Sequence, residues 1–149
     1  MQPYGPAVLR VVTGAVFVAH GAQKLFGVWG GGGLAATAGF FTQVGLTPAY
    51  PLAVLVALVE FAGGLLLILG ALTLVAALAL AINMTVAIWK VHAAHGFFLP
   101  AGFEYNLALI GALVALMLSG PGAFSVDGWR ARSAEAEAYG RARIRSGNV

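Results

Sequence analysis

Three polar side chains lie inside long apolar stretches of this sequence. His20 and Glu60 each interrupt a run of apolar residues, and Asn83 interrupts the run that follows Gly70. If these stretches cross a membrane, an ionisable group within them costs at least about 2.5 kcal/mol even on the lenient insertion scale, so it should face other helices and find a partner. We therefore expect His20 and Glu60 to form a pair, with Asn83 as a nearby hydrogen-bond donor or acceptor.

The chemistry available to such a pair is proton transfer, because a histidine and a carboxylic acid can hold and pass on a proton. In a dry pocket, a neutral His20 beside a protonated Glu60 would avoid two buried charges, whereas a wet pocket would favour the ion pair. A purely structural role is the alternative, in which the polar layer holds the helices in register through interhelical hydrogen bonds. The sequence leaves both roles open.

A second polar group follows near the ends of two later apolar stretches. Its members are Lys90, His92, His95, Glu104, Tyr105 and Asn106. The two histidines and Glu104 have the chemistry of an open metal site, but no further ligand stands at a firm spacing, so we predict no metal. Haem is not predicted either, because the depths of His20 and His92 differ by about 10 Å and facing axial ligands need nearly equal depth. A funnel from His92, Lys24 and Glu104 to His20 and Glu60 is a hypothesis.

The composition indicates the solvent in which these groups lie. Of 149 residues, 60% are hydrophobic and 9% are charged, whereas a soluble domain carries about a quarter charged residues. A chain this short folds as one domain, and that domain is expected to sit in lipid. The absence of cysteine excludes disulfides and thiolate metal ligands. Nucleic-acid binding is not predicted, because the arginines of the C-terminal tail alternate with Glu135 and Glu137 and lack an aromatic platform.

The apolar stretches predict four membrane-spanning helices, near residues 7–26, 49–70, 74–89 and 103–119. The run from Pro51 to Trp89 would form a helix of about 58 Å, nearly twice the thickness of the hydrocarbon layer, so it must fold back on itself. Gly70 and Thr73 mark the only plausible turn. Helix rise then places His20 about 20 Å, and Glu60 and Asn83 about 16 Å, from the inner face, at one mid-membrane level.

A shorter helix is expected between the first two spans. Leu34–Val44 follows the glycine run at 30–33 and has helical spacing, but it is too short to cross, so we expect a re-entrant or interfacial helix. Backbone groups in lipid must be satisfied internally, which excludes loose strands. The predicted fold is therefore an all-α membrane protein. It has a four-transmembrane-helix bundle over residues 1–127, followed by a basic cytoplasmic tail over 128–149.

Charged and small residues predict how the bundle is oriented and packed. Arg10, Arg130 and Arg132 outnumber Lys24 and Lys90 near the membrane ends, which places both termini in the cytoplasm, with the two lysines snorkelling on the outer side. On the first helix, one inward stripe contains Arg10, Thr13, Phe17, His20 and Lys24. Close helix packing is expected at Ala15 and Ala19, at Gly63 and Gly64, and at Ala77 and Ala81.

Four segments resemble the DoxX family of small bacterial membrane proteins: AHGAQKLFGVWGGGGLAATAGFF, LVEFAGGLLLILGALT, HAAHGFF followed by FEYNLALI, and SGPGAFSVD. The resemblance covers residues 9–127 and implies four spans in the bacterial inner (plasma) membrane. By position, it places the family's polar signature on His20, Lys24, Glu60, Glu104, Tyr105 and Asn106. The family is associated with quinone-linked oxidation and with oxidative-stress complexes, which implies a subunit that works beside a redox enzyme.

The favoured interpretation is a membrane subunit that supports quinone-linked redox chemistry, with His20 and Glu60 handling a proton or a quinone carbonyl. A quinone is the cofactor expected, and the partners expected are the lipid bilayer, a membrane or peripheral redox enzyme and further copies of the chain. A scaffold or assembly factor for an oxidoreductase and a small-solute transporter are the alternatives. The expected binding residues are His20, Lys24, Glu60, Asn83, Glu104, Tyr105 and Asn106.

Overall fold

The computed structural model describes residues 4–146, so the last three residues of the predicted tail, 147–149, lie outside the described part. All regular structure between residues 4 and 146 is helical. The helices are α1 (Tyr4–Phe26), α2 (Gly33–Gln43), α3 (Ala49–Leu69), α4 (Thr73–Ala87), α5 (Glu104–Ser119) and α6 (Val126–Ser146). A π-helical turn, Ile88–His92, and a 3-10 turn, Ala93–His95, continue α4.

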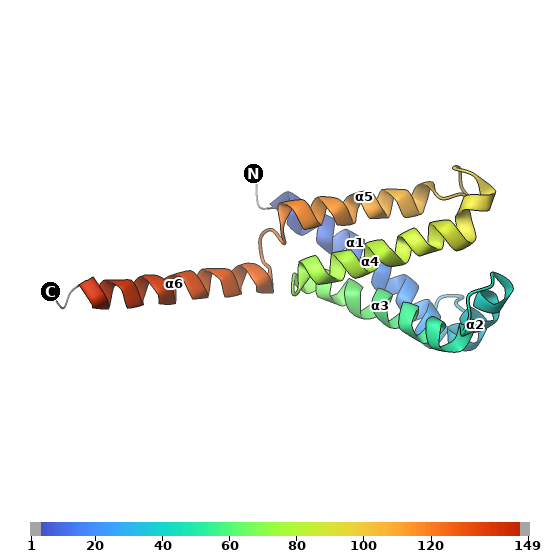
Figure 1. Cartoon of the computed structure of the whole chain (residues 1–149), viewed down its shortest axis with the longest axis horizontal. Helices are drawn as coiled ribbons and strands as arrows, with labels where there is room; N and C mark the ends of the chain where they lie inside the picture. The colour runs from blue at the N-terminus through green and yellow to red at the C-terminus, as the bar shows by residue number, and fades with distance from the viewer. Residues whose placement is uncertain (1–3, 147–149) are drawn as a thin grey trace.

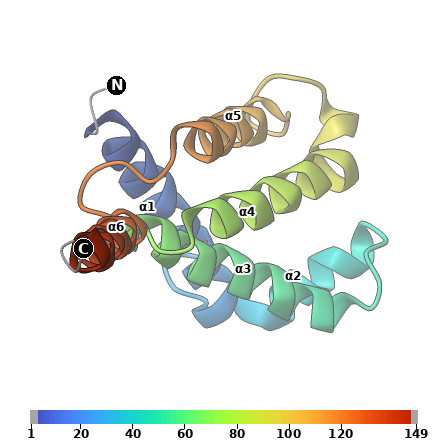
Figure 2. The ribbon, with the colours of Figure 1, turned by 60° about the vertical axis from the view of Figure 1, so that its left-hand side comes forward.

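Four of these helices form a bundle, in which α1 packs along α3 while α4 packs against both α3 and α5 (Figure 1). The short helix α2 packs on α3 and α1 at one end of the bundle (Figure 2). From the opposite end, α6 projects away from the bundle along its long axis. We call these the α2 end and the α6 end.

Three helical segments are long and apolar enough to cross a membrane: α1, α3 and the continuous segment Thr73–His95. The apolar helix α5, with 16 residues, is shorter. The predicted all-helical membrane fold is thus confirmed, but the predicted third span, 74–89, ended too early. No glycine or proline interrupts residues 71–95, so the helical path continues until Gly96, whose positive φ of 78° ends it.

The predicted turn at Gly70–Thr73 is confirmed. Gly70 caps α3 in the left-handed conformation, with φ 62°, and α4 begins at Thr73. A side chain from far along the sequence completes this hairpin, because Asp127 accepts hydrogen bonds from the backbone N–H groups of Leu72 and Thr73, at 2.9 and 2.8 Å. The hairpin is therefore tied to the start of α6.

Small residues let α1 and α3 approach closely, as expected for helices in lipid. A Cβ added to Gly21 would overlap the backbone of Phe61, and one added to Gly64 would lie 2.7 Å from the Gly14 carbonyl oxygen. Gly63 and Gly64 were predicted correctly, whereas Ala15 is exposed and the prediction for it was wrong. The contact face of α1 lies one residue earlier, at Gly14.

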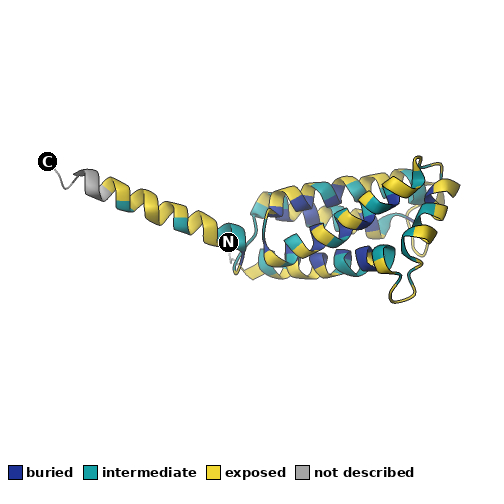
Figure 3. Cartoon of the chain, turned by 90° about the horizontal axis from the view of Figure 1, so that it is seen from below, coloured by how far each residue is buried: buried dark blue, intermediate teal, exposed yellow. Residues whose placement is uncertain are grey.

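The side chains are distributed as lipid requires (Figure 3). Arg10, Thr13 and Phe17 from the predicted inward stripe are buried. Apolar side chains cover the outside of the bundle, and they include Val8, Val12, Leu55, Leu58, Leu65, Leu78, Ile82 and Leu118. The outer surface of the bundle therefore suits a hydrocarbon solvent, whereas α6 is exposed along most of its length.

Candidate functional site

A pocket of about 580 Å³ lies at the α2 end of the bundle. Its walls come from α1, α2, α3, α4 and α5, and they are mostly apolar. Eight polar or ionisable side chains line it: His20, Lys24, Thr37, Glu60, Asn83, His92, Tyr105 and Asn106. A concave, largely apolar cavity with a few convergent polar groups is the usual form of a small-molecule site.

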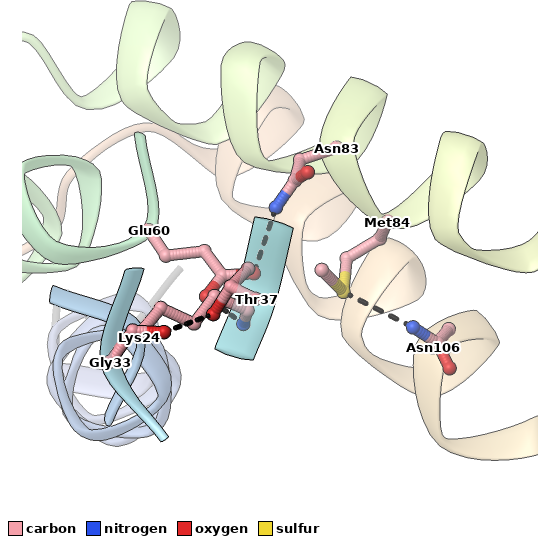
Figure 4. Close-up of polar contacts among 7 residues, drawn as sticks. All are labelled: Lys24, Gly33, Thr37, Glu60, Asn83, Met84 and Asn106. Carbon is pink, nitrogen blue, oxygen red and sulfur yellow. Dashed lines mark hydrogen bonds and ion pairs between the residues drawn. The ribbon is translucent and has the colours of Figure 1, made fainter. Parts of the chain in front are cut away.

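A charged cluster occupies one wall of this pocket (Figure 4). Glu60 on α3 is 3% exposed, and its Oε2 forms an ion pair with the Nζ of Lys24 on α1. Its Oε1 accepts a hydrogen bond of 3.0 Å from Nδ2 of Asn83 on α4. Three different helices therefore meet at one carboxylate, and each of its oxygens has a partner.

This cluster differs from the predicted His20–Glu60 pair. Within residues 4–146, the side-chain partners of Glu60 are Lys24 and Asn83. Lys24 lies one turn beyond His20 on the same stripe of α1, and its long side chain turns inward instead of snorkelling to the outer interface. Helix rise estimates the level of a residue, but it takes no account of how far a lysine reaches.

The opposite wall carries polar groups that the protein leaves largely unpaired. Nδ2 of Asn106 on α5 donates to the Sδ of Met84 at 3.4 Å, and a thioether is a weak acceptor. The rings of His20 and Tyr105 lie 6.4 Å apart, and both residues line the pocket and are exposed. Asn106 and Tyr105 form the side of the pocket that we call the α5 wall, which can still donate and accept hydrogen bonds.

Glu104 is the one predicted binding residue that the structure does not bring to the pocket. Its Oε1 accepts a hydrogen bond of 2.8 Å from the backbone N–H of Leu99. The loop over residues 96–103 is further closed by a bond from the Phe103 N–H to the Gly96 carbonyl. Leu99, Pro100 and Gly102 of this loop line the pocket, and we call the loop its roof. The hydrogen bond between Glu104 and Leu99 therefore holds the roof in place.

The histidines near this roof are engaged with the backbone. His92 lines the pocket, and its Nδ1 donates to the Ala101 carbonyl at 2.8 Å. His95 donates to the Val91 carbonyl at 3.0 Å. Among the residues that the structure describes, no cluster of three histidine, aspartate, glutamate or cysteine side chains could hold a metal ion. Of the hypothetical funnel, the structure thus places His92 and Lys24 at the pocket with His20 and Glu60.

Residues of α2 are the part of the pocket that the sequence did not predict. Ala36, Thr37, Phe40 and Phe41 line it, and Phe41 is buried. The available signal was the complete lack of charged residues between positions 25 and 59. Such a segment can lie against a membrane-embedded site without desolvating a charge.

Arg10 is a second residue whose role the sequence did not predict. Its place on the inward stripe is confirmed, since it is only 2% exposed, but its bonding partners were not predicted. Its guanidinium group donates to five backbone carbonyls, those of Leu67, Ile68, Pro121, Ala123 and Phe124. It joins the end of α3 to the loop that precedes α6, and we call this arrangement, together with the Asp127 cap, the clasp.

Asp127 completes the clasp from outside the bundle. Partial burial by itself would raise the pKa of its carboxyl group, but hydrogen bonds from Thr73 and Leu72 and the charge of Arg130 outweigh burial and lower that pKa below its ordinary value. The carboxylate is therefore the form that caps α4, where a negative charge also complements the helix dipole.

The chain is similar to a known family and to known proteins. The family model described as DoxX matches residues 5–93. A protein of Bacillus subtilis (strain 168) named "Putative oxidoreductase CatD" is 34% identical over 112 residues, which cover 75% of this chain and 78% of the relative. An uncharacterized protein of Haemophilus influenzae is 32% identical over 134 residues, 85% of this chain and 90% of the relative. No solved structure matches.

Proposed function

Since the chain belongs to the DoxX family, we propose that it is a membrane subunit that supports quinone-linked redox chemistry and that the pocket at the α2 end binds the quinone ring. One observation carries the proposal: an apolar cavity of about 580 Å³ is lined by the polar cluster of α1, α3 and α4 and by polar side chains of α5. The oxidoreductase name of the Bacillus relative supports a redox role.

The residues of the pocket fit such a ring. A quinone has an apolar ring with carbonyl acceptors at opposite edges, so it needs apolar walls and hydrogen-bond donors on two sides. Lys24 and Asn83 supply donors from one wall, and Asn106 and Tyr105 supply them from the α5 wall. When bound, a quinone supplies two-electron, two-proton redox chemistry, and we assign the source of electrons to a partner oxidoreductase.

The residues of the charged cluster would position and hold the proton. The side chain of Lys24 is 27% exposed, and an ammonium group has three donors, of which one faces Glu60. Lys24 Nζ can therefore hold a proton toward the cavity while Glu60 Oε2 fixes its position. Asn83 holds the other carboxylate oxygen. His20, on the same helix as Lys24, is the second proton-handling group in this proposal.

We further propose four membrane crossings, with both termini in the cytoplasm of a bacterial cell and the bundle in its inner membrane. Support for the fourth crossing comes from α5, whose 16 residues span about 24 Å at 1.5 Å per residue. Support for the orientation comes from the exposed cations. Arg130, Arg132 and Arg141 are exposed beyond the α6 end, whereas Lys24 at the other end is paired, and arginine-rich flanks favour the cytoplasmic side.

A redox enzyme, either peripheral or membrane-bound, is the partner that the proposal requires. The helix α6 is the candidate contact, because it projects from the bundle (Figure 1) with Trp129 and Tyr139 exposed. Affinity purification of the full chain from its native membrane, followed by mass spectrometry, should recover an oxidoreductase. Recovery of the chain alone or with further copies of itself would contradict this part of the proposal.

Quinone binding can be tested with menadione, a tailless naphthoquinone. We expect the purified protein in nanodiscs to bind menadione and Glu60→Gln to bind it about tenfold more weakly. Removing the charge at position 60 releases Lys24, and a hydrogen bond to a charged group contributes about 1.5–3 kcal/mol. The measurement is the partition of menadione between nanodiscs with and without protein. The chain has no cysteine, so thiol adducts cannot imitate binding.

The matched control is Glu135→Gln, which removes an exposed carboxylate on α6 and should leave binding unchanged. Circular dichroism should show equal helicity for both variants. If the wild-type protein takes up no menadione, or if the Glu60 variant binds it as well as the wild type does, the proposed function is wrong.

A further inference from the structure

The pocket is bounded by two helices that do not pack on one another as a pair. Thr37, Phe40 and Phe41 of α2 and Met84, Val86 and Ala87 of α4 all line it. In the part of the chain described, α2 packs against α3 and α1, whereas α4 packs against α3 and α5. Figure 2 shows α2 and the end of α4 apart on this flank of the bundle. The flank between them is therefore closed by side chains alone.

Most other sides of the pocket are packed. Helix pairs α1–α3, α3–α4 and α4–α5 are in contact, and the loop at 96–103 forms the roof, held by Glu104. On the side between α1 and α5, the rings of His20 and Tyr105 lie 6.4 Å apart and both residues are exposed, so this side is bordered by polar groups. The flank between α2 and α4 differs, because apolar side chains border it.

Side chains on this flank belong both to the pocket and to the lipid-facing surface. Val86 is 38% exposed, and it follows Leu78 and Ile82 at four-residue spacing on the exposed stripe of α4. Phe40 on α2 also lines the pocket and is 42% exposed. The edge of the cavity thus meets the outer surface of the bundle at apolar side chains.

This edge lies at the depth of the hydrocarbon layer. Val86 is about 20 Å along the helix from Thr73, within a layer about 30 Å thick. Residues 25–59, which contain α2, carry no charge. An opening here would face lipid tails rather than water.

We propose that the pocket opens sideways into the bilayer between α2 and α4, at Ala36, Phe40 and Val86, and that its ligand carries an apolar tail that lies in this opening. We call it the α2–α4 portal. The inference rests on the proposed function and deepens it, because it assigns the ligand to tailed, lipid-soluble quinones that enter from the membrane. The polar ring would lie between the charged cluster and the α5 wall, and the tail would extend past Val86.

The test compares menadione with phylloquinone, which has the same ring and a phytyl tail. In nanodiscs, Val86→Trp should weaken phylloquinone binding about tenfold, the equivalent of about two buried methylene groups. Menadione binding should fall by clearly less, because Val86 lies at the edge of the pocket and is not one of the polar groups that would hold the ring. The matched control is Ile82→Trp, one turn away, which is 57% exposed and does not line the pocket. It should bind both quinones as the wild type does.

A second variant, Ala36→Phe, narrows the portal from the α2 side and should give the same tail-selective loss if Val86→Trp fails to fold. Equal losses for both quinones in the portal variants, or unchanged phylloquinone binding, would overturn the portal and leave the ring site standing. Binding of neither quinone by the wild type would overturn the proposed function and the portal with it. Tail-selective loss in Ile82→Trp as well would show that the tail lies elsewhere on α4.

Discussion

The two ends of the bundle each turn a cation from α1 inward, and the two cations have different surroundings. At the α6 end, Arg10 is buried, donates five hydrogen bonds to backbone carbonyls and does not line the pocket. At the α2 end, Lys24 pairs with Glu60 in the wall of a cavity of about 580 Å³. Both residues lie on one stripe of the same helix.

The difference separates a structural charge from a candidate binding group. An ionisable residue inside a membrane is a functional-site hypothesis by default, and residue type alone would rank Arg10 with Lys24. The criterion that distinguishes them is whether the protein itself uses all the donors and acceptors. All the N–H donors of the Arg10 guanidinium group are used by backbone carbonyls at the end of α3 and in the loop before α6. Lys24 and the α5 wall, in contrast, can still form hydrogen bonds with a molecule in the cavity.

The largest effect that would test this comparison is on stability. Arg10→Ala leaves five carbonyls without their donor, and we expect it to lower the free energy of unfolding by at least about 3 kcal/mol. Lys24→Ala should lower it by a smaller amount, since Lys24 is only partly buried and Glu60 keeps the hydrogen bond from Asn83. The measurement is denaturant unfolding in mixed micelles, followed by circular dichroism.

Arg132→Ala, on the exposed part of α6, is the control for loss of an arginine and should change little. Equal destabilisation by the Arg10 and Lys24 variants would mean that the two ends are built alike. In that case, the charged cluster would be a structural clasp and not a ligand site.

Much of the fold was predictable because apolar length and breakers are local signals. The all-helical membrane class, the turn at Gly70 and the helix after the glycine run follow from residue runs and helix rise alone. The extension of the third helical segment to His95 is not predicted from sequence, because the polar residues Lys90 and His92 resemble a boundary. A few polar residues do not end a helix, and Gly96 does.

The sequence predicted which residues gather at the pocket, but it did not predict which of them bond to one another. Six of the seven predicted binding residues line one pocket, and the seventh, Glu104, holds its roof. Depth along a helix gives the level of a residue, but the direction and reach of its side chain depend on the neighbouring helices. The same limit hid the role of Arg10, whose acceptors lie 57–58 and 111–114 residues away.

A smaller loss of stability is expected from a change at the contact between α1 and α3, the two helices that connect the ends of the bundle. Gly21 lies against the backbone of Phe61 with no room for a Cβ, so Gly21→Ala should push α1 away from α3 and destabilise the bundle by about 1–3 kcal/mol. Gly111→Ala on α5 meets no atom within 4 Å and should be neutral or slightly stabilising. Thermal unfolding of the two variants gives the comparison. A Gly21→Ala protein as stable as Gly111→Ala would show that the two helices do not pack as closely as the structure places them.

The smallest predicted effect is a change in stability at acid pH, caused by Asp127 of the clasp. The pKa of Asp127 is lower in the folded protein than its ordinary value of 3.8, so its contribution to stability is fully present above that pH and is lost as pH falls through the folded pKa. Asp127→Asn, which keeps an acceptor oxygen but cannot titrate, should therefore lack this part of the acid dependence. We expect the stability difference between wild type and variant to shrink below about pH 3.8 and to stay constant from pH 5 to 7.

Subtracting the variant's profile from that of the wild type removes the contribution of the other carboxylates. Glu137→Gln on exposed α6 supplies the reference, since its loss should leave the wild-type profile nearly unchanged. If the difference between wild type and Asp127→Asn grows as pH falls, the sign of the linkage is reversed and the carboxylate does not stabilise the start of α4. The clasp would then depend on Arg10 alone, and its contrast with the α2 end would rest on a single buried guanidinium group.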